Sequence, residues 1–171
     1  MPLLRERRID FALLTEPIED VDVVNEELYS YRMGLVVSRS DPLAQRKSVH
    51  LAELKDYYFV CNNSSPDQRD SIFDICSRAG FRPRLRMECD DADLIGEAVS
   101  RGLGISFVTK RRFRENNVED PNRPWRKDTA FVEVEDDFCV RTIRIAYLRG
   151  AYHTACEQNF LRGLRAHFAE E

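Results

Sequence analysis

Polar side chains that could bind a small molecule gather directly after a short apolar run. Asn62, Asn63, Ser64 and Ser65 stand there, ahead of Pro66. Their amides and hydroxyls can donate to and accept from a ligand, and a helix that begins here would add free backbone N–H groups. A turn and a helix cap explain the same residues, so the sequence leaves both interpretations open.

A second polar group lies further along and is acidic. It consists of Asp90, Asp91, Ala92 and Asp93, at the predicted start of another helix. A carboxylate at this point accepts from the first N–H groups of the helix and is stabilised by the helix dipole. Three carboxylates would also repel an anionic ligand, so helix capping is the predicted role of Asp91.

No set of residues indicates catalysis or metal binding. The histidines, His50, His153 and His167, lack metal-ligand spacing, and the sequence contains no G-x-S-x-G, H-E-x-x-H or P-loop motif. The segment from Gly102 to Ser106, GLGIS, lacks the third glycine of a dinucleotide-binding fingerprint. We therefore expect no enzyme activity, no cofactor and no metal.

The cysteines have no C-x-x-C spacing, and five is an odd number. Cys61 borders the first polar group, which makes it the one candidate for a redox-sensing thiol. Cys76 and Cys89 lie on predicted apolar faces and are expected in the core. We expect all five to be reduced and unpaired; the other two are Cys139 and Cys156.

Capping and periodicity predict an alternating pattern of strands and helices around these groups. We expect strands at 57–61, 85–89 and 105–108, with helices at 66–79 and 91–101. Short connections between alternating strands and helices favour right-handed crossovers. The sequence thus predicts a three-stranded parallel core.

The flanking segments are less regular. Strands are expected at 9–14 and 33–37, separated by an acidic stretch from Glu16 to Glu27, and a long surface loop is expected over 110–128. Two more strands, at 131–134 and 140–148, precede a final helix. That helix starts at Thr154 with a T-x-x-E capping box to Glu157. Its predicted buried residues are Phe160, Leu161, Leu164 and Phe168.

Composition limits the classes of protein that remain. The chain has 171 residues, 43% of them hydrophobic, a net charge of −4 and a pI of about 5.5. Its apolar runs are far shorter than the ~18 residues of a membrane helix, and its start does not read as a secretory signal. We expect a soluble, cytoplasmic domain that does not adhere to nucleic acid through its net charge.

Several motifs, in order, resemble the effector-binding domain of LysR-type transcriptional regulators. They are IDFALLTEP, SDPLA, VHLAELKDYYFV, AGFRPRLRMECDDADLIGEAVSRGLGISFV and IRIAYLRG. The resemblance covers nearly the whole chain. It implies an α/β fold of the periplasmic-binding-protein-like type 2 class, with two lobes joined by two crossover strands and an effector in the cleft between them.

The resemblance also implies lobe boundaries and contact residues. Lobe I would comprise 1–55 and 140–171, and would be incomplete; lobe II would comprise 56–139. The residues carried over as effector contacts come from the ends of strands and the starts of helices. They are Thr15, Glu16, Asn62, Asn63, Ser64, Ser65, Asp91, Ala92, Phe107 and Thr109.

A regulator of this family senses a small molecule to control transcription. Its DNA-reading winged helix-turn-helix, and the first strand and helix of lobe I, have no counterpart in this sequence. We therefore expect a fragment or truncated product that forms a homodimer through lobe I only weakly. A solute-binding protein or enzyme on the same fold, and a thiol-based redox sensor, remain as alternatives.

Overall fold

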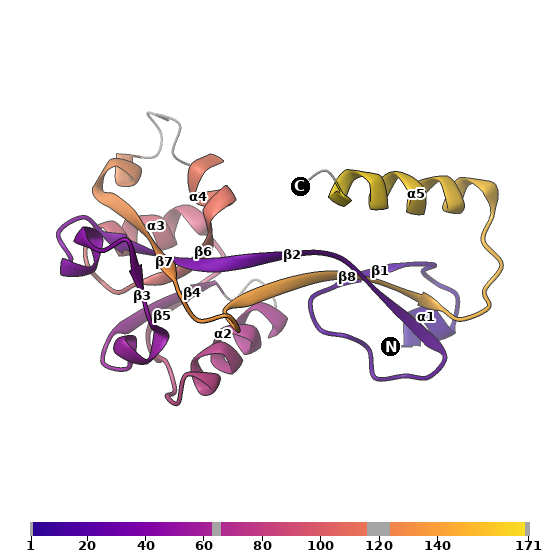
Figure 1. Cartoon of the computed structure of the whole chain (residues 1–171), viewed down its shortest axis with the longest axis horizontal. Coiled ribbons are helices and arrows are strands. Elements are labelled where there is room, and N and C mark those ends of the chain that lie inside the picture. Colours follow the sequence, from indigo (N-terminus) through magenta and orange to yellow (C-terminus); the bar gives the residue numbers. More distant parts are fainter. Residues whose placement is uncertain (1, 63–65, 116–123, 170–171) are drawn as a thin grey trace. The chain divides into compact units, whose positions relative to one another are not determined.

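The computed structural model describes residues 2–62, 66–115 and 124–169 (Figure 1). The chain divides into two compact units. We call residues 1–31 with 141–171 the terminal unit and residues 32–140 the central unit. This division differs from the predicted lobes at both boundaries, because residues 32–55 and residue 140 belong to the central unit.

The terminal unit is a small sheet with two helices, α1 (Pro2–Arg5) and α5 (Ala155–Ala169). Strand β1 (Ala12–Leu14) pairs antiparallel with β8 (Val140–Leu148), and β8 neighbours β2 (Val23–Ser38). The core of this unit is formed by buried apolar side chains from α1, β2 and β8. They are Leu4, Val23 and Ala146.

Helix α5 begins as the sequence predicts. The backbone N–H of Thr154 donates to Glu157 Oε2 at 2.7 Å, and the N–H of Glu157 donates to Thr154 Oγ1 at 3.4 Å. Leu161 is buried, but the predicted burial of Phe160 is wrong because its side chain is 50% exposed. Its ring instead lies against Phe11, with centroids 5.8 Å apart.

Strand β2 is much longer than predicted, since it starts at Val23 rather than Met33. The acidic residues inside it favoured a loop in the sequence. The structure pairs them with arginines from distant segments: Glu26 with Arg165 and Glu27 with Arg144, each at 2.6 Å. These ion pairs allow carboxylates to occupy strand positions.

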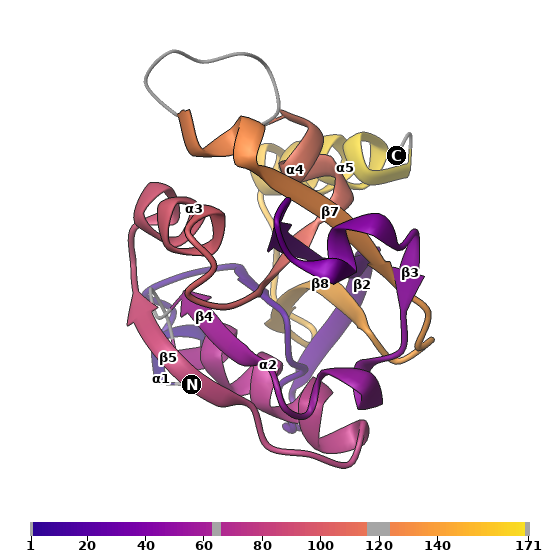
Figure 2. The same cartoon turned by 90° about the vertical axis from the view of Figure 1, so that its left-hand side faces the viewer.

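The central unit contains the strand and helix alternation that the sequence predicts (Figure 2). Strand β4 (Tyr58–Asn62) leads to α2 (Pro66–Arg78), and β5 (Arg84–Cys89) leads to α3 (Ala92–Ser100). β4 and β5 pair in parallel, as predicted.

The predicted third strand of this core is placed differently. β6 (Ser106–Thr109) forms its ladder antiparallel with the end of β2, and only a single parallel bridge, Phe59↔Ile105, links this segment to β4. The predicted parallel neighbour of β4 is thus present only as that one bridge, and the prediction is wrong in placing the ladder of the third strand there. The long β2 supplies a ladder for β6 that local sequence patterns could not reveal.

β2 also carries the remaining strands of the central unit. β7 (Thr129–Val134) pairs with it antiparallel, and β3 (Ser48–Val49) pairs with β7 in parallel. The short 3-10 helices η1 (Pro42–Gln45) and η2 (Leu51–Leu54) flank β3.

The long loop predicted over 110–128 contains regular structure at both ends. α4 (Lys110–Glu115) follows β6 directly, and η3 (Pro124–Asp128) precedes β7. Thr109 Oγ1 accepts from the N–H of Arg112 at 3.0 Å and so caps the start of α4. Residues 116–123 lie outside the described part of the chain.

The largest core cluster lies in the central unit. Its fully buried members come from β2, the 3-10 helices, β4 and β7, and include Leu35, Val37, Leu51, Leu54, Phe59 and Val132. Cys61, Cys76 and Cys139 are buried in the same cluster. No helix among the described residues is long and apolar enough to span a membrane.

Candidate functional site

The ends of three strands approach one edge of the central unit. Asn62 and Cys89 are register partners at the carboxyl ends of β4 and β5. The N–H of Val60 donates to Ile105 O at 2.8 Å, and the N–H of Ile105 donates to Tyr58 O at 2.9 Å, as in a parallel ladder. Both strands rise by the same distance per residue from this bridge, so β6 ends at the same edge of the unit as β4. We call this edge, defined by Asn62, Cys89 and Thr109, the carboxyl edge.

The start of α3 adds backbone donors at the carboxyl edge. Asp91 Oδ1 accepts from the N–H groups of Asp93 and Leu94 at 2.7 and 3.1 Å, which confirms the predicted cap. The thiol of Cys89 donates to Asp91 O at 3.4 Å and holds the turn against the end of β5. Asp91 and Ala92 are both exposed, so a ligand has access to them.

The remaining predicted contacts of the central unit differ in position. Thr109 is half-buried at the carboxyl edge, where its hydroxyl oxygen caps α4. The ring of Phe107 stacks on Phe59, with centroids 5.8 Å apart and an interplanar angle of 15°, so this side chain packs on the core. Asn63, Ser64 and Ser65 lie outside the described residues.

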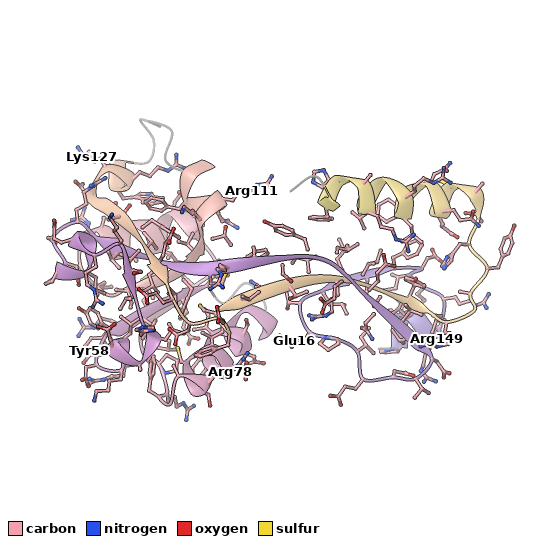
Figure 3. All side chains as sticks on the ribbon, viewed as in Figure 1. Glu16, Tyr58, Arg78, Arg111, Lys127 and Arg149 are labelled. Carbon is pink, nitrogen blue, oxygen red and sulfur yellow. The ribbon has the colours of Figure 1, made fainter. Side chains whose placement is uncertain are left out.

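Thr15 and Glu16 belong to the terminal unit, where they follow β1. Arg144 donates to the backbone oxygen of Thr15 at 2.6 Å and to Glu27 Oε1 at the same distance. Arg144 therefore binds the backbone of Thr15 and not its hydroxyl, which is half-buried. Glu16 is exposed (Figure 3).

Sequence reasoning missed a cavity of about 580 Å³ in the central unit, which begins one residue beyond Thr109. Four of its charged side chains are paired with one another, Lys110 with Glu133 and Arg32 with Asp137 at 2.7 Å, and Glu135 lies 3.2 Å from His50. These pairs join segments that lie far apart in the sequence, so the sequence does not reveal them. The only local signal is the alternation of polar and apolar residues in β7, which is typical of a strand with one exposed face.

The described residues contain no group of three or more His, Cys, Asp or Glu side chains arranged to hold a metal ion. Cys61, the candidate redox thiol, is 1% exposed. A redox-sensing thiol needs access to its oxidant, and the burial of Cys61 does not provide it.

The sequence profile of the family described as LysR substrate binding domain matches residues 1–169. This chain belongs to that family. It is 34% identical over 113 residues to the transcriptional dual regulator GltC of Bacillus subtilis, covering 66% of this chain and 38% of GltC. It is 26% identical over 164 residues to the transcriptional regulator SsuR of Burkholderia cenocepacia, covering 94% of this chain and 50% of SsuR. The chain thus spans half or less of the length of these relatives.

Solved structures of LysR regulators share its fold. Full-length BenM carrying E226K matches with a TM-score of 0.82 and 25% identity, over 99% of this chain and 54% of BenM. The BenM effector binding domain with its effector benzoate matches with a TM-score of 0.79 and 25% identity, over 99% of this chain and 73% of that one. The LysR domain therefore has the periplasmic-binding-protein-like type 2 fold, which confirms the predicted α/β class.

Proposed function

We propose that this chain is the ligand-sensing domain of a LysR-type transcriptional regulator, and that it binds a small-molecule effector without catalysing a reaction. The observation that carries this proposal is the carboxyl edge of the central unit. Ligands of open parallel sheets bind beyond the carboxyl ends of the strands, where helix N-termini present free N–H groups. The fold neighbours include BenM with benzoate and QuiR with shikimate, both small carboxylates.

The proposed contacts at this edge are the Asn62 amide, the turn at Asp91 and Ala92, and the Thr109 hydroxyl. Phe107 contributes only backbone, because its ring is packed on Phe59. The family resemblance adds five further proposed contacts, which are Thr15, Glu16, Asn63, Ser64 and Ser65.

The whole regulator would act in the cytoplasm on DNA, through a winged helix-turn-helix outside this 171-residue sequence, and as a homodimer. The family relationship supports this proposal, because GltC and SsuR are transcriptional regulators. The same relationship favours a sensor over an enzyme or a solute-binding protein.

Calorimetric titration with a panel of small carboxylates and metabolites tests the effector site. Asn62→Ala should weaken binding of any ligand found by about 1–3 kcal/mol, the cost of leaving a buried ligand group without its hydrogen-bond partner. Gln158→Ala removes an exposed amide on α5 and serves as the matched control. Unfolding curves without ligand separate loss of binding from loss of stability.

Equal affinity of the wild type and Asn62→Ala, in a protein that remains folded, would place the effector elsewhere. Turnover of a panel compound during the titration would contradict the proposal of a sensor without catalysis.

A further inference from the structure

A second cavity lies in the central unit at the other end of β4. Its volume is about 230 Å³. β4 begins at this cavity with Tyr58 and ends at the carboxyl edge with Asn62, so the two places are separated by the length of the strand. Its walls come from four segments that the sequence keeps apart: the end of β2, the start of β4, β5 and the turn before β6.

The side chain of Arg86 lines this cavity from β5, beside a shift in the register between β4 and β5. Phe59 is the partner of Leu85, but the next residue, Val60, is the partner of Met87, so Arg86 is the extra residue of a β-bulge. Bulges change the direction of a side chain and are frequent beside binding sites. Beside this one, the guanidinium of Arg86 lies 3.8 Å from the centroid of the Tyr58 ring.

Arg86 forms no ion pair or hydrogen bond with the part of the chain that the structure describes. Arg84, by contrast, lies over the same Tyr58 ring at 5.0 Å and has the carboxylate of Asp56 at 3.9 Å. A stacked guanidinium keeps the N–H groups along its edge available, and their fixed geometry matches a carboxylate. Arg86 therefore presents a preoriented carboxylate-binding group to the cavity.

The wall opposite Arg86 is made of backbone. A Cβ on Gly104 would be 2.5 Å from the backbone oxygen of Tyr58, so only glycine allows the turn to approach β4 this closely. Gly102, in the same turn, has a φ of +74°. Leu103 and Ile105 supply the apolar part of the lining.

Two carboxylates share the cavity with Arg86. They belong to Asp41, whose Oδ1 accepts from the N–H of Leu43 at 2.8 Å, and to Asp56. Burial and the nearby Asp41 raise the pKa of Tyr57, which keeps its hydroxyl neutral and able to donate or accept. The cavity thus offers a cationic group, anionic groups and a neutral hydroxyl within a small volume.

We propose that this cavity binds a free α-amino acid, with the ligand carboxylate on Arg86 and its ammonium facing Asp41 and Asp56. A ligand with a single charge would face an unmatched charge of its own sign, whereas a zwitterion satisfies both. Pockets for drug-sized ligands start at about 300 Å³, so this cavity suits a smaller molecule of amino-acid size. The site is separate from the carboxyl edge and does not depend on the proposed effector.

Calorimetry of the full 171-residue chain against the individual proteinogenic amino acids tests this proposal. We expect at least one to bind, and its analogues lacking either the amino or the carboxylate group to bind at least about tenfold more weakly, the loss of one charge-assisted contact. Arg86→Gln should cause a loss of the same size. Arg162→Gln is the matched control: it removes an exposed arginine of α5, away from the lining of the cavity, and should change affinity by less than about twofold.

Asp41→Asn keeps the capping oxygen and removes the charge, so it tests the ammonium contact without loss of the fold. Binding that depends on Asn62 but not on Arg86 would assign the amino acid to the carboxyl edge and overturn the second site. Equal binding of the deaminated analogue would reduce the cavity to a simple anion site and overturn the proposal as well. So would the absence of binding by every amino acid to a chain that still binds an effector.

Discussion

Trp125 of η3 covers Gly96 of α3 so closely that a Cβ on the glycine would be 2.5 Å from two atoms of the indole ring. The contact packs η3 against α3, the helix whose N-terminus lies at the carboxyl edge. Gly96→Ala should therefore lower the free energy of unfolding by about 1–3 kcal/mol, the usual cost of overpacking. Chemical denaturation followed by tryptophan fluorescence measures this, because the chain has one Trp.

Gly163 in α5 provides the opposite case, since a Cβ there meets nothing within 4 Å. Gly163→Ala should stabilise the protein by about 0.5–1 kcal/mol through helix propensity alone. If Gly96→Ala stabilised the protein as Gly163→Ala is expected to, the close packing of Trp125 on Gly96 would be contradicted.

The proposed effector contacts of Thr15 and Ser64 can be tested by removing single hydroxyls. Thr15→Val keeps the side-chain volume and leaves the backbone oxygen that Arg144 binds. Thr15→Val and Ser64→Ala should each weaken effector binding by about 1–3 kcal/mol and hardly change stability. A titration in which neither substitution alters the affinity would remove both residues from the proposed site.

The five thiols should differ sharply in reactivity. Burial raises the pKa of Cys76 and of Cys139 to about 12, so both remain protonated and unreactive at pH 8. Cys156 is exposed and should be alkylated first. Mass spectrometry after a short maleimide pulse should show one fast addition in the wild type and none in Cys156→Ser.

All five thiols should react after unfolding, because each of them is free in the structure. Rapid labelling of Cys76 in the folded protein would contradict its burial. An intact mass two daltons lower without reductant than with it would indicate a disulfide and restore the redox hypothesis.

The pair of Glu26 with Arg165 should make stability depend on pH in acid. Arg165 donates through Nε and Nη2 to the two carboxylate oxygens, both at 2.6 Å, and these hydrogen bonds hold the pKa of Glu26 below its ordinary value of 4.5. A lowered folded-state pKa contributes stability that is present above pH 4.5 and is lost as the pH falls through that lowered value. Both side chains are partly exposed, so the contribution is at most about 1 kcal/mol.

Glu26→Gln should therefore be less stable than the wild type at pH 7, and the difference should disappear in acid. Glu6→Gln serves as the control, because the Glu6 carboxylate has only a distant Arg8 at 3.8 Å. Thermal unfolding of the three proteins between pH 7 and pH 3 gives the comparison. A difference that stays constant over this range would show that the ion pair does not stabilise α5 on β2.

Local signals predicted the elements that carry their own caps and periodicity. Asp91 at the start of α3 and the Thr154–Glu157 box are read directly from neighbouring residues, and the structure contains both. The start of β2 could not be predicted in this way, because Glu26 pairs with Arg165, which lies 139 residues away in the sequence.

In the candidate site, too, the features encoded by neighbouring residues could be predicted, and those that depend on tertiary contacts could not. Asn62 and Asp91 were recognisable as the ends of predicted elements, and β4 and β5 pair as expected. The packing of Phe107 on Phe59 depends on a tertiary contact, and so does the stacking of Arg86 on Tyr58. Neither leaves a pattern in its own segment.

The pairing of β1 with β8 has a consequence for the folding of the chain during synthesis. Leu13 pairs with Ile145, whereas the central unit consists of one continuous segment, residues 32–140. Domains fold as units while the ribosome is still elongating the chain, so the central unit is complete while Val23 still lacks its core partner Ala146. The N-terminal residues of the terminal unit are thus synthesised before the central unit but become buried only after it has folded. During that interval their apolar side chains are exposed to chaperones and proteases.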